Sequence, residues 1–351
     1  MKNILFIAPN DGSDTRINKE VISLSKNAYV YYIGIGEYKN ISFVQKHCTG
    51  FFLIPGKNNS ALTIIKQILK AIRILISHKI SSIHFINEHS FIFFYPFIWN
   101  KYVVLDLFDS IFLTLNKPKN QWSIIKRIIY LPVNKVIVTD ENRRGLLPDF
   151  LNESNKVVVL ENFPNYFSLP KKNKEKNNKI TILYSGTLME RRGTNILFNL
   201  VNKDHQIKII CAGWIKDYET KKLINHPSVN YLGIMKQEEL LKITAHQCDY
   251  ILSVYEPLHM QNINASPNKI YDSIMCDVPS IINNEVKISS FVKEENIGIV
   301  LNNYYNIDYN SFIEELKTRK DTFIFSNELK YNNSWNMVES RLLKAHGLLI
   351  N

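Results

Sequence analysis

Short apolar runs and amphipathic segments alternate along almost the whole chain, and this pattern predicts strands that alternate with helices. The amphipathic segments include a helix that begins near Asp14, with Ile17, Val21 and Leu24 on one face, and a longer helix over 61–77. The apolar runs of the first half that are typical of strands are residues 3–8, 29–35, 82–86, 102–105, 135–138 and 156–160. Such alternation favours an α/β fold with parallel sheets and crossover helices.

The alternation is interrupted over 169–179, where LPKKNKEKNNK contains five lysines and one glutamate and has no large apolar residue after Leu169. A stretch of this composition cannot bury a face, and it is typical of a solvated linker. The pattern then restarts, with strands predicted over 180–184, 207–211, 229–232, 250–254 and 279–282 and helices over 194–201, 237–245 and 267–275. We therefore expect two doubly wound, Rossmann-like domains.

The predicted domains are residues 1–167 and 180–334, joined by a linker over 168–179. In the last segment, 335–351, apolar residues recur at helical spacing from Trp335 to residue 349, and packing back on the first domain is one option for this helix. A length of 351 residues agrees with two domains. No GxGxxG sequence follows either opening strand, which argues against a dinucleotide-dependent oxidoreductase.

Basic residues outnumber acidic ones by 43 to 32, a net charge of +11, which fits a polyanion, an anionic membrane surface or a phosphate-bearing ligand as partner. The four cysteines are scattered without a CxxC pair, so we expect neither a disulfide framework nor structural zinc. The opening apolar run is too short for a signal peptide, and the longest aromatic-apolar run, 90–99, is too short to span a bilayer. These features predict a cytoplasmic protein.

The first group of candidate site residues lies in ASPNKIYDSIMCDVP, residues 265–279. Ser266 suits a helix N-cap and Pro267 suits the first helical position, so a helix is expected to begin here, directly after a strand and its loop. The free N–H groups and the positive dipole end of a helix start favour a diphosphate. Asp272 follows Asn268 by one helical turn, on the same side, where its carboxylate can accept hydrogen bonds from a ribose diol.

A second group lies in YSGTLMERRG, residues 184–193, after the first strand of the second domain. Gly186 permits a tight turn from strand to loop. Either Arg191 or Arg192 can reach a phosphate at a neighbouring helix start. Because the two groups follow corresponding strands of one sheet, we expect them to form one site.

With these groups in place, the sequence resembles the GT-B glycosyltransferases, in particular the retaining family 4 and its surface-polysaccharide transferases. The resemblance extends over about residues 3–345, and it depends on the run from Gly186 to Gly193 and on the Pro-x-Lys-x-x-acid run that contains Lys269 and Asp272. It implies two Rossmann-like domains that face each other across a cleft. It also implies a nucleotide-sugar donor.

By this resemblance Arg192 takes the place of the diphosphate-binding lysine, and Thr187 stands where the family has an arginine. The Glu-x7-Glu signature of the family maps onto Asn264 and Asp272, which both depart from it, and backbone near Met235 is the implied nucleobase site. The implied donor-binding residues are Gly12, Gly186, Thr187, Arg192, Met235, Asn264, Asn268, Lys269 and Asp272.

In the first domain, Gly12 resembles a glycine that lets the backbone approach the donor phosphate. Residues 105–109 resemble an Asp-x-His-Asp element in which Phe108 replaces the histidine, and Asp109 is the candidate for contact with the reacting sugar or the acceptor hydroxyl. Glu88 is the reserve catalytic residue. The resemblance implies retention, in which the leaving diphosphate can itself take the acceptor proton, so no separate general base is assigned. It implies no cofactor, and no metal ion is expected.

Between Ser110 and Thr139 the chain has five basic residues and no acidic one, interleaved with Trp122 and several isoleucines. This composition fits a basic amphipathic surface that docks on anionic lipid near a polyprenyl-linked acceptor, at the inner face of the cell membrane. An ordinary helix whose apolar face joins the core explains the same pattern.

The sequence thus predicts an enzyme that moves a sugar from a nucleotide-diphosphate donor to a glycan or lipid-linked saccharide in surface-polysaccharide assembly. One alternative is a non-hydrolysing sugar-nucleotide epimerase, which would need catalytic acids and a histidine. Another is a non-enzymatic two-domain ligand-binding protein, which the lack of an export signal disfavours. Nucleic-acid binding is disfavoured because the basic residues lie in linker and surface stretches without a recognised module.

Overall fold

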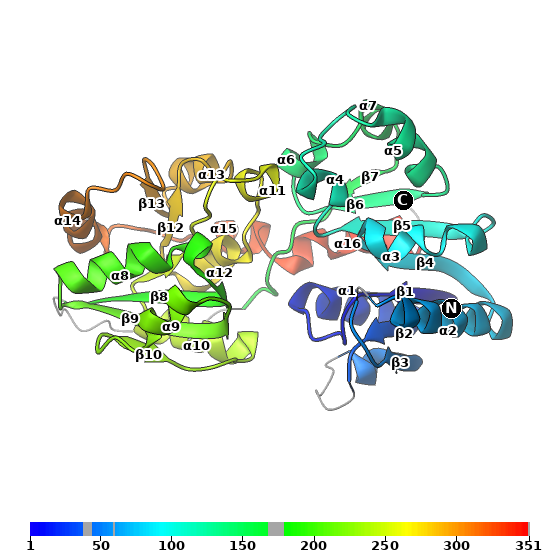
Figure 1. Ribbon diagram of the computed structural model, residues 1–351, viewed down its shortest axis with the longest axis horizontal. Coiled ribbons are helices and arrows are strands. Elements are labelled where there is room, and N and C mark those ends of the chain that lie inside the picture. The colour runs from blue at the N-terminus through cyan, green and yellow to red at the C-terminus, as the bar shows by residue number, and fades with distance from the viewer. Residues whose placement is uncertain (38–43, 59, 168–178, 350–351) are drawn as a thin grey trace. The chain divides into compact units, whose positions relative to one another are not determined.

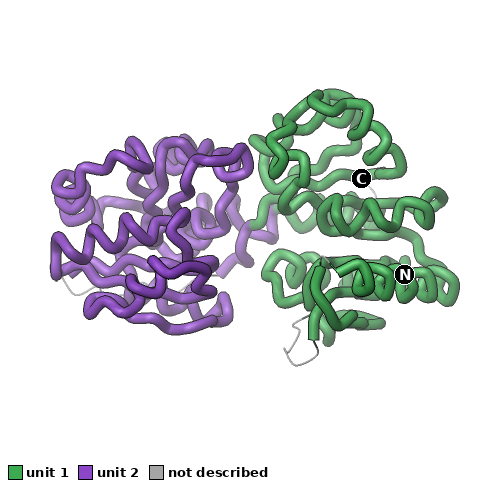
Figure 2. Tube along the Cα trace, in the orientation of Figure 1, with its two compact units in different colours: residues 1–162, 338–351 green, residues 163–337 purple. Residues whose placement is uncertain are grey.

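The computed structural model describes residues 1–37, 44–58, 60–167 and 179–349, and within them the chain forms two compact units. Unit 1 comprises Met1–Asn162 with Val338–Asn351, and unit 2 comprises Phe163–Met337 (Figure 2). Apart from Lys179, the predicted linker lies outside the described residues. Within the described part of the chain, no helix combines the length and the apolar character that crossing a bilayer requires.

Unit 1 is built on a parallel sheet with the strand order β3-β2-β1-β4-β5-β6-β7 (Figure 1). The order reverses between β1 and β4, because the chain adds strands first on one side of β1 and then on the other. The strands are β1 (Lys2–Ile7), β2 (Ala28–Ile35), β3 (Gly50–Ile54), β4 (Ile80–Ile86), β5 (Tyr102–Leu107), β6 (Lys135–Val138) and β7 (Val157–Val159).

Both faces of this sheet are covered, which explains why its strands are apolar almost throughout. One face packs on α2 (Ala61–Ser77), α3 (Asn87–Ile92), α4 (Ile111–Thr114) and α5 (Ser123–Tyr130). The opposite face, which includes Phe6 and His84, contacts α1 (Thr15–Ser25) and α16 (Trp335–Ala345). The remaining helices are α6 (Glu141–Arg144) and α7 (Asp149–Asn152).

Unit 2 is built on a second parallel sheet, with the order β10-β9-β8-β11-β12-β13 and a reversal between β8 and β11. Its strands are β8 (Ile180–Leu188), β9 (Ile207–Ile215), β10 (Val229–Tyr231), β11 (Tyr250–Leu252), β12 (Ser280–Asn283) and β13 (Gly298–Leu301). Its helices are α8 (Thr194–Lys203), α9 (Tyr218–Ile224), α10 (Gln237–Gln247), α11 (Met260–Ile263), α12 (Asn268–Cys276), α13 (Ser289–Glu294), α14 (Tyr309–Arg319) and α15 (Asn327–Asn332).

The predicted alternation of strands and helices is confirmed, with the α1 face of Ile17, Val21 and Leu24 fully buried. Several predicted boundaries were wrong, with the largest differences at the ends of β8, β9 and α16. The first strand of unit 2 does not end at residue 184, because β8 and β9 stay paired as far as Leu188 and Ile215. The last helix ends at Ala345 instead of residue 349. Gly347 has a positive φ of 62°, and the Leu348 N–H donates to the Leu343 carbonyl at 2.9 Å, which closes the helix.

Candidate functional site

Apart from Met235, the predicted donor-binding residues of unit 2 lie near the carboxyl ends of β8 and β11, where the strand order of the sheet reverses. In open parallel sheets such a reversal leaves a crevice, because the connections on its two sides run to opposite faces. Gly186 belongs to β8, and Lys269 lies in the α12 that follows β11. The fold therefore joins two segments that are far apart in the sequence.

Gly186 marks the place where β8 comes close to a lysine. Its φ of 90° suits glycine, and a Cβ atom built on it would lie 3.6 Å from Lys269 Nζ. The neighbouring strand approaches much more closely, since a Cβ on Gly213 would lie 1.9 Å from the Gly186 carbonyl oxygen. Thr187 follows as an exposed strand residue paired with Trp214, so the predicted turn at Gly186 is in fact a continuing strand.

Two cations, Arg192 and Lys269, lie in this region. The Arg192 guanidinium stacks on the Tyr255 ring, 3.7 Å from its centroid. Burial lowers the pKa of the Lys269 ammonium, the positive charge of Arg192 lowers it further, and Tyr255 and Asp272 act in the opposite direction. The two positive charges are thus close enough to repel each other, and an anion bound between them would relieve that repulsion.

Arg191 has different surroundings from its neighbour. Its side chain is 56% exposed, and its Nε lies 3.4 Å from the Glu256 carboxylate. Its backbone carbonyl accepts a hydrogen bond from the Glu256 N–H at 3.0 Å. The sequence pattern did not decide whether Arg191 or Arg192 would reach the phosphate. In the structure, Arg192 is the one that lies beside Lys269.

The α12 helix begins one residue later than predicted. Pro267 occupies the N-cap position, where its side chain makes no capping hydrogen bond, and the Ser266 hydroxyl lies 2.9 Å from the Tyr271 hydroxyl. The prediction of Ser266 as N-cap was wrong, because the helix begins one residue later and the Ser266 hydroxyl pairs with Tyr271. Asn268 is the first residue of the helix. A helix start without a side-chain cap has N–H groups that suit an anion.

The remaining predicted donor residues of unit 2 surround this helix start. Asp272 is half-buried and accepts a hydrogen bond from Gln237 Nε2 at 3.1 Å. Asn264 is only 1% exposed, and its Nδ2 donates to the Met260 carbonyl at 2.8 Å, so its side chain is part of the packing around α11. Met235 lies half-buried in the loop between β10 and α10.

Tyr255 is a site residue that the sequence analysis missed. It is 8% exposed, and both of its backbone groups bond to Asn283, whose Oδ1 accepts from the Tyr255 N–H at 2.9 Å and whose Nδ2 donates to its carbonyl at 3.0 Å. This clamp holds the ring against Arg192. The available signal was its position after the predicted strand over 250–254, which is too common to identify a site residue.

Three further predicted residues belong to unit 1. Gly12 has a φ of 84° in the loop after β1, and its N–H donates to Asn10 Oδ1 at 2.9 Å. Asp109 is exposed after β5, with its N–H bonded to Asn87 Oδ1 at 2.9 Å. Glu88 is fully buried, and it accepts hydrogen bonds from Ser110 Oγ at 2.7 Å and from the Tyr130 hydroxyl at 2.8 Å. Its carboxylate therefore holds α3, α4 and α5 together.

Comparison with solved structures finds chains that share this architecture over nearly their whole length. Alr3699/HepE from Anabaena, in complex with UDP and glucose, has a TM-score of 0.73 and 14% identity, and the match covers 99% of this chain and all of that one. The lipopolysaccharide outer core galactosyltransferase WaaB has a TM-score of 0.64 and 10% identity over 98% of both chains. The sucrose-phosphate synthase of Thermosynechococcus elongatus has a TM-score of 0.65 and 11% identity over 99% and 95%.

This chain has the GT-B fold. The fold that the sequence resemblance implied, two Rossmann-like domains, is thereby confirmed. No protein-family model matches the sequence, and no curated protein matches it either. At identities of 10–14%, the solved structures establish the architecture alone.

The first sheet of this GT-B fold also contains a buried ionic cluster. Arg16 on α1 bonds to Glu20 Oε1 at 2.8 Å, to Asp106 Oδ2 at 2.8 Å and to the Leu160 carbonyl at 2.9 Å. Among the described residues, Glu20, Asp106 and His84 form the one group of three side chains close enough to share a metal ion. The Arg16 guanidinium balances the charge of one of the two carboxylates, and burial together with the charge of Asp106 raises the pKa of Glu20 well above its usual value. A protonated Glu20 beside an Arg16–Asp106 ion pair gives the cluster a structural explanation.

Proposed function

We propose that this protein is a glycosyltransferase that uses a nucleotide-diphosphate sugar. The observation that supports the proposal best is the pair of cations, Arg192 and Lys269, beside Gly186 and the uncapped start of α12. A bound diphosphate would supply negative charge to balance these two cations. HepE, which has the same fold, is described as a complex with UDP and glucose.

In this proposal Arg192, Lys269 and the N–H groups at Asn268 bind the diphosphate. As the bond between the sugar and the diphosphate breaks, negative charge grows on the leaving phosphate, and these groups stabilise it more than they stabilise the ground state. Two fixed cations and a helix dipole supply the positive charge that a metal ion provides in other transferases, so we propose a reaction without metal or other cofactor.

Asp272 is proposed to accept hydrogen bonds from the ribose diol, and backbone near Met235 to contact the nucleobase. Thr187 is exposed beside Gly186 and can donate its hydroxyl to a phosphate oxygen. Asn264 and Glu88 are left out of the proposed binding and catalytic groups, because their side chains are buried and bonded within the fold.

Asp109 remains the proposed contact for the reacting sugar or the acceptor hydroxyl, since its carboxylate is exposed at the carboxyl end of β5. Gly12, in the loop after β1, is proposed to let backbone approach the donor phosphate. If Asp109 acts on the reacting groups, Asp109→Asn will lower turnover by at least tenfold and leave the affinity for UDP unchanged. Equal loss of turnover and of UDP binding would assign Asp109 a different role.

The acceptor is proposed to be a glycan or a polyprenyl-linked saccharide of a surface polysaccharide, with the sugar transferred with retention at the inner face of the membrane. Support comes from WaaB, a galactosyltransferase of the lipopolysaccharide outer core that shares the fold.

Thermal shift with UDP, GDP and dTDP, followed by incubation with the corresponding labelled sugar donors and lipid-linked acceptors, tests the proposal. The expected result is stabilisation by one nucleotide diphosphate and transfer of label to an acceptor. Isomerisation of the free donor would instead identify an epimerase, and binding without turnover in the presence of acceptors would identify a binding protein.

A further inference from the structure

One layer of unit 1 contains most of its exposed large apolar side chains. This layer consists of α2, α5 and residues 92–99, which all pack against the same face of the sheet. The exposed apolar residues of the layer and its loops are Leu62, Ile65, Leu69, Ile76, Ile92, Phe93, Phe97, Trp99, Leu115, Trp122, Ile124, Ile125, Ile128 and Leu131. Soluble surfaces rarely collect so many large apolar groups on one side, so this layer is a candidate for binding.

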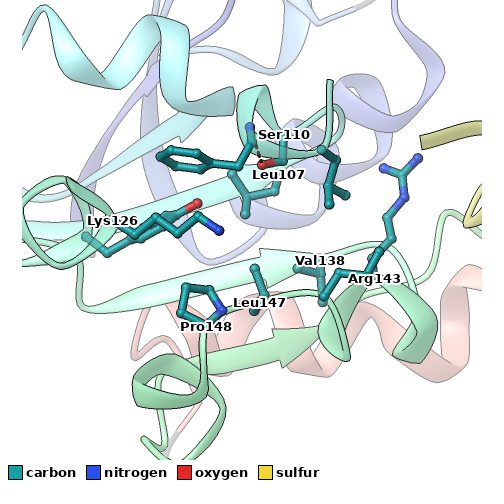
Figure 3. A pocket seen from close by; sticks show the side chains of 11 residues that line it. Leu107, Ser110, Lys126, Val138, Arg143, Leu147 and Pro148 are labelled. Atoms are coloured by element: carbon teal, nitrogen blue, oxygen red, sulfur yellow. Dashed lines mark hydrogen bonds between the residues drawn. The ribbon is translucent and has the colours of Figure 1, made fainter. Parts of the chain in front are cut away.

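The α5 helix exposes three isoleucines and buries a lysine, while its Tyr130 and the partly buried Ile129 pack on the core. Ile124, Ile125 and Ile128 are 76%, 47% and 57% exposed, while Lys126 is 1% exposed. Lys126 points inward toward a small pocket, as Figure 3 shows, and its Nζ donates to the carbonyl oxygens of Lys117 and Lys119 at 2.6 and 2.7 Å. These three isoleucines are therefore not core residues, and an ordinary helix whose apolar face joins the core does not account for them.

The aromatic segment 92–99 continues the apolar surface of α5. The Tyr95 hydroxyl donates to the Ile128 carbonyl at 2.6 Å, and the Tyr95 ring lies edge-on to Trp99, with 5.5 Å between the centroids. Trp99 itself is 56% exposed. Isoleucines and amphipathic aromatic side chains thus lie next to each other, a combination found where proteins meet the interfacial region of a bilayer.

The charge of this layer has one sign. Residues 61–139 include ten lysines and arginines but only three acidic residues. Two of these, Glu88 and Asp106, are fully buried, and the third, Asp109, lies at the strand end. The exposed basic residues include Lys66 and Arg73 on α2 and Arg127 on α5. A protein partner would need an acidic residue opposite each of these basic residues. A layer of anionic headgroups places negative charge opposite all of them.

We propose that the layer formed by α2, α5 and residues 92–99 docks on an anionic lipid bilayer. The isoleucines of α5 and the aromatic groups of 92–99 enter the interfacial region, and the lysines and arginines contact the headgroups. The exposure and the charge of its side chains define this surface. The choice of a membrane as its partner rests in part on the proposed function, because a polyprenyl-linked acceptor lies in a membrane.

Co-flotation with vesicles tests this proposal on the full-length protein. Vesicles of phosphatidylcholine and vesicles of phosphatidylcholine mixed with phosphatidylglycerol are compared at low and at high salt. We expect the protein to float with the anionic vesicles at low salt, to be largely released at high salt, and to bind the neutral vesicles at least tenfold more weakly. Equal binding to both vesicle types, or no binding to either, would overturn the proposal.

Substitutions at two exposed isoleucines, one inside the layer and one outside it, test which surface contacts the membrane. Ile124 on α5 is 76% exposed and Ile324 of unit 2 is 82% exposed, so glutamate at either position changes the charge equally without opening a core. Ile124→Glu is expected to weaken vesicle binding at least fivefold and Ile324→Glu to leave it within twofold. Equal effects of the two variants would overturn the assignment to this layer. So would a dimer in sedimentation that Ile124→Glu dissociates, because a second copy would then cover the surface.

Binding of UDP without vesicles separates this proposal from the proposed function. If the protein floats with anionic vesicles but binds no nucleotide diphosphate, the proposed enzymatic activity fails and the membrane surface stands. If it binds UDP and transfers sugar but never floats, the membrane surface fails and the enzyme stands.

Discussion

Two neighbouring arginines of unit 2 differ in what surrounds them, and the difference gives a direct test at the scale of single residues. Arg192 stacks on Tyr255 close to Lys269, whereas Arg191 is 56% exposed and pairs with Glu256. A single alanine at each position removes the same charge from nearly the same place in the sequence. The two variants therefore separate a bound phosphate from a general effect of positive charge.

We expect Arg192→Ala to weaken the binding of a nucleotide diphosphate by about 1–3 kcal/mol, the usual contribution of a charged hydrogen bond. Arg191→Ala is the control and should change the affinity by no more than about twofold, because an exposed ion pair contributes little. Isothermal titration calorimetry with UDP measures both. Equal losses for the two variants would show that the guanidinium of Arg192 has no specific contact.

The pH dependence of nucleotide binding tests Lys269. Burial and the charge of Arg192 lower the pKa of its ammonium, so in the free protein it loses its proton at a lower pH than an exposed lysine, which titrates near about 10.4. Affinity for UDP should therefore decline as the pH rises through that lowered pKa. Arginine stays charged throughout, so in Lys269→Arg the decline should be absent or move to higher pH. The same decline in Lys269→Gln would assign the titration to another group.

Sequence reasoning predicted that Gly186, Arg192, Lys269 and Asp272 belong to one site. These residues could be predicted because a glycine, a cation or a helix start that directly follows a strand can be recognised from the order of residues in the sequence alone. Sequence reasoning could not place Lys269 against Gly186, because that contact depends on the order of the strands. It also missed Tyr255, whose role depends on the clamp by Asn283.

At the scale of elements, the contact between β8 and β9 is closer than side chains normally allow. Gly213 has a φ of 137°, and a Cβ there would lie 1.9 Å from the Gly186 carbonyl oxygen, whereas Gly233 has a φ of 75° with nothing within 4 Å. Both positions have a positive φ, so the two glycines differ mainly in the space around them. They form a matched pair for a stability measurement.

We expect Gly213→Ala to lower the free energy of unfolding by about 3 kcal/mol or more, because backbone strain and a backbone clash add together. Gly233→Ala should cost about 1 kcal/mol, the strain alone. Urea denaturation of the two variants gives both values. A loss at Gly213 no larger than that at Gly233 would mean that the two strands can separate freely at this end.

The α16 helix is tied to the sheet of unit 1 through a chain of buried polar groups. His346 Nε2 lies 3.0 Å from His84 Nδ1, and His346 Nδ1 lies 2.9 Å from Ser82 Oγ. Burial lowers the pKa of His346 to about 3, and burial also lowers the pKa of His84. Both imidazoles are consequently neutral in the folded protein at neutral pH.

Acid should weaken this attachment in a way that His346→Gln removes. An unfolded histidine takes up a proton near about pH 6.5, while folded His346 does not until about pH 3, so stability is complete above pH 6.5 and lost below it. The stability advantage of the wild type over His346→Gln should therefore shrink by up to about 1.4 kcal/mol per pH unit below 6.5. The exposed His205 provides the control variant, His205→Gln, for urea unfolding between pH 5 and 8. A gap that does not change with pH would mean that His346 is not neutral in the fold.

The elements that the sequence predicted well have strong periodicity. The α2 helix was predicted over 61–77 and has those bounds, because its amphipathic pattern is long and uninterrupted. β3 and β13 were missed, although predicted strands such as 135–138 are no longer than they are. Both begin with glycine, a residue that is depleted in strands. The extension of β8 past Tyr184 was missed because glycine usually interrupts strands, and here it is needed for the approach of β9.

At the scale of the whole molecule, the basic residues behind the net charge of +11 gather in at least two places. In unit 2 a pair of cations lies at the start of a helix, and in unit 1 exposed basic residues surround an apolar layer. The sequence predicted both as separate uses of positive charge. It could not decide which face of α5 was exposed, because the same spacing of isoleucines fits a core face, and only the burial of Lys126 distinguishes the two.

The central claim is that unit 2 binds a nucleotide diphosphate at the start of α12, and a crystal structure with UDP or GDP tests it most directly. We predict phosphate oxygens within hydrogen-bond distance of the Arg192 guanidinium, of Lys269 Nζ and of the N–H groups at Asn268. A nucleotide whose phosphates lie away from all three, with the α12 start in contact with solvent alone, would contradict the claim.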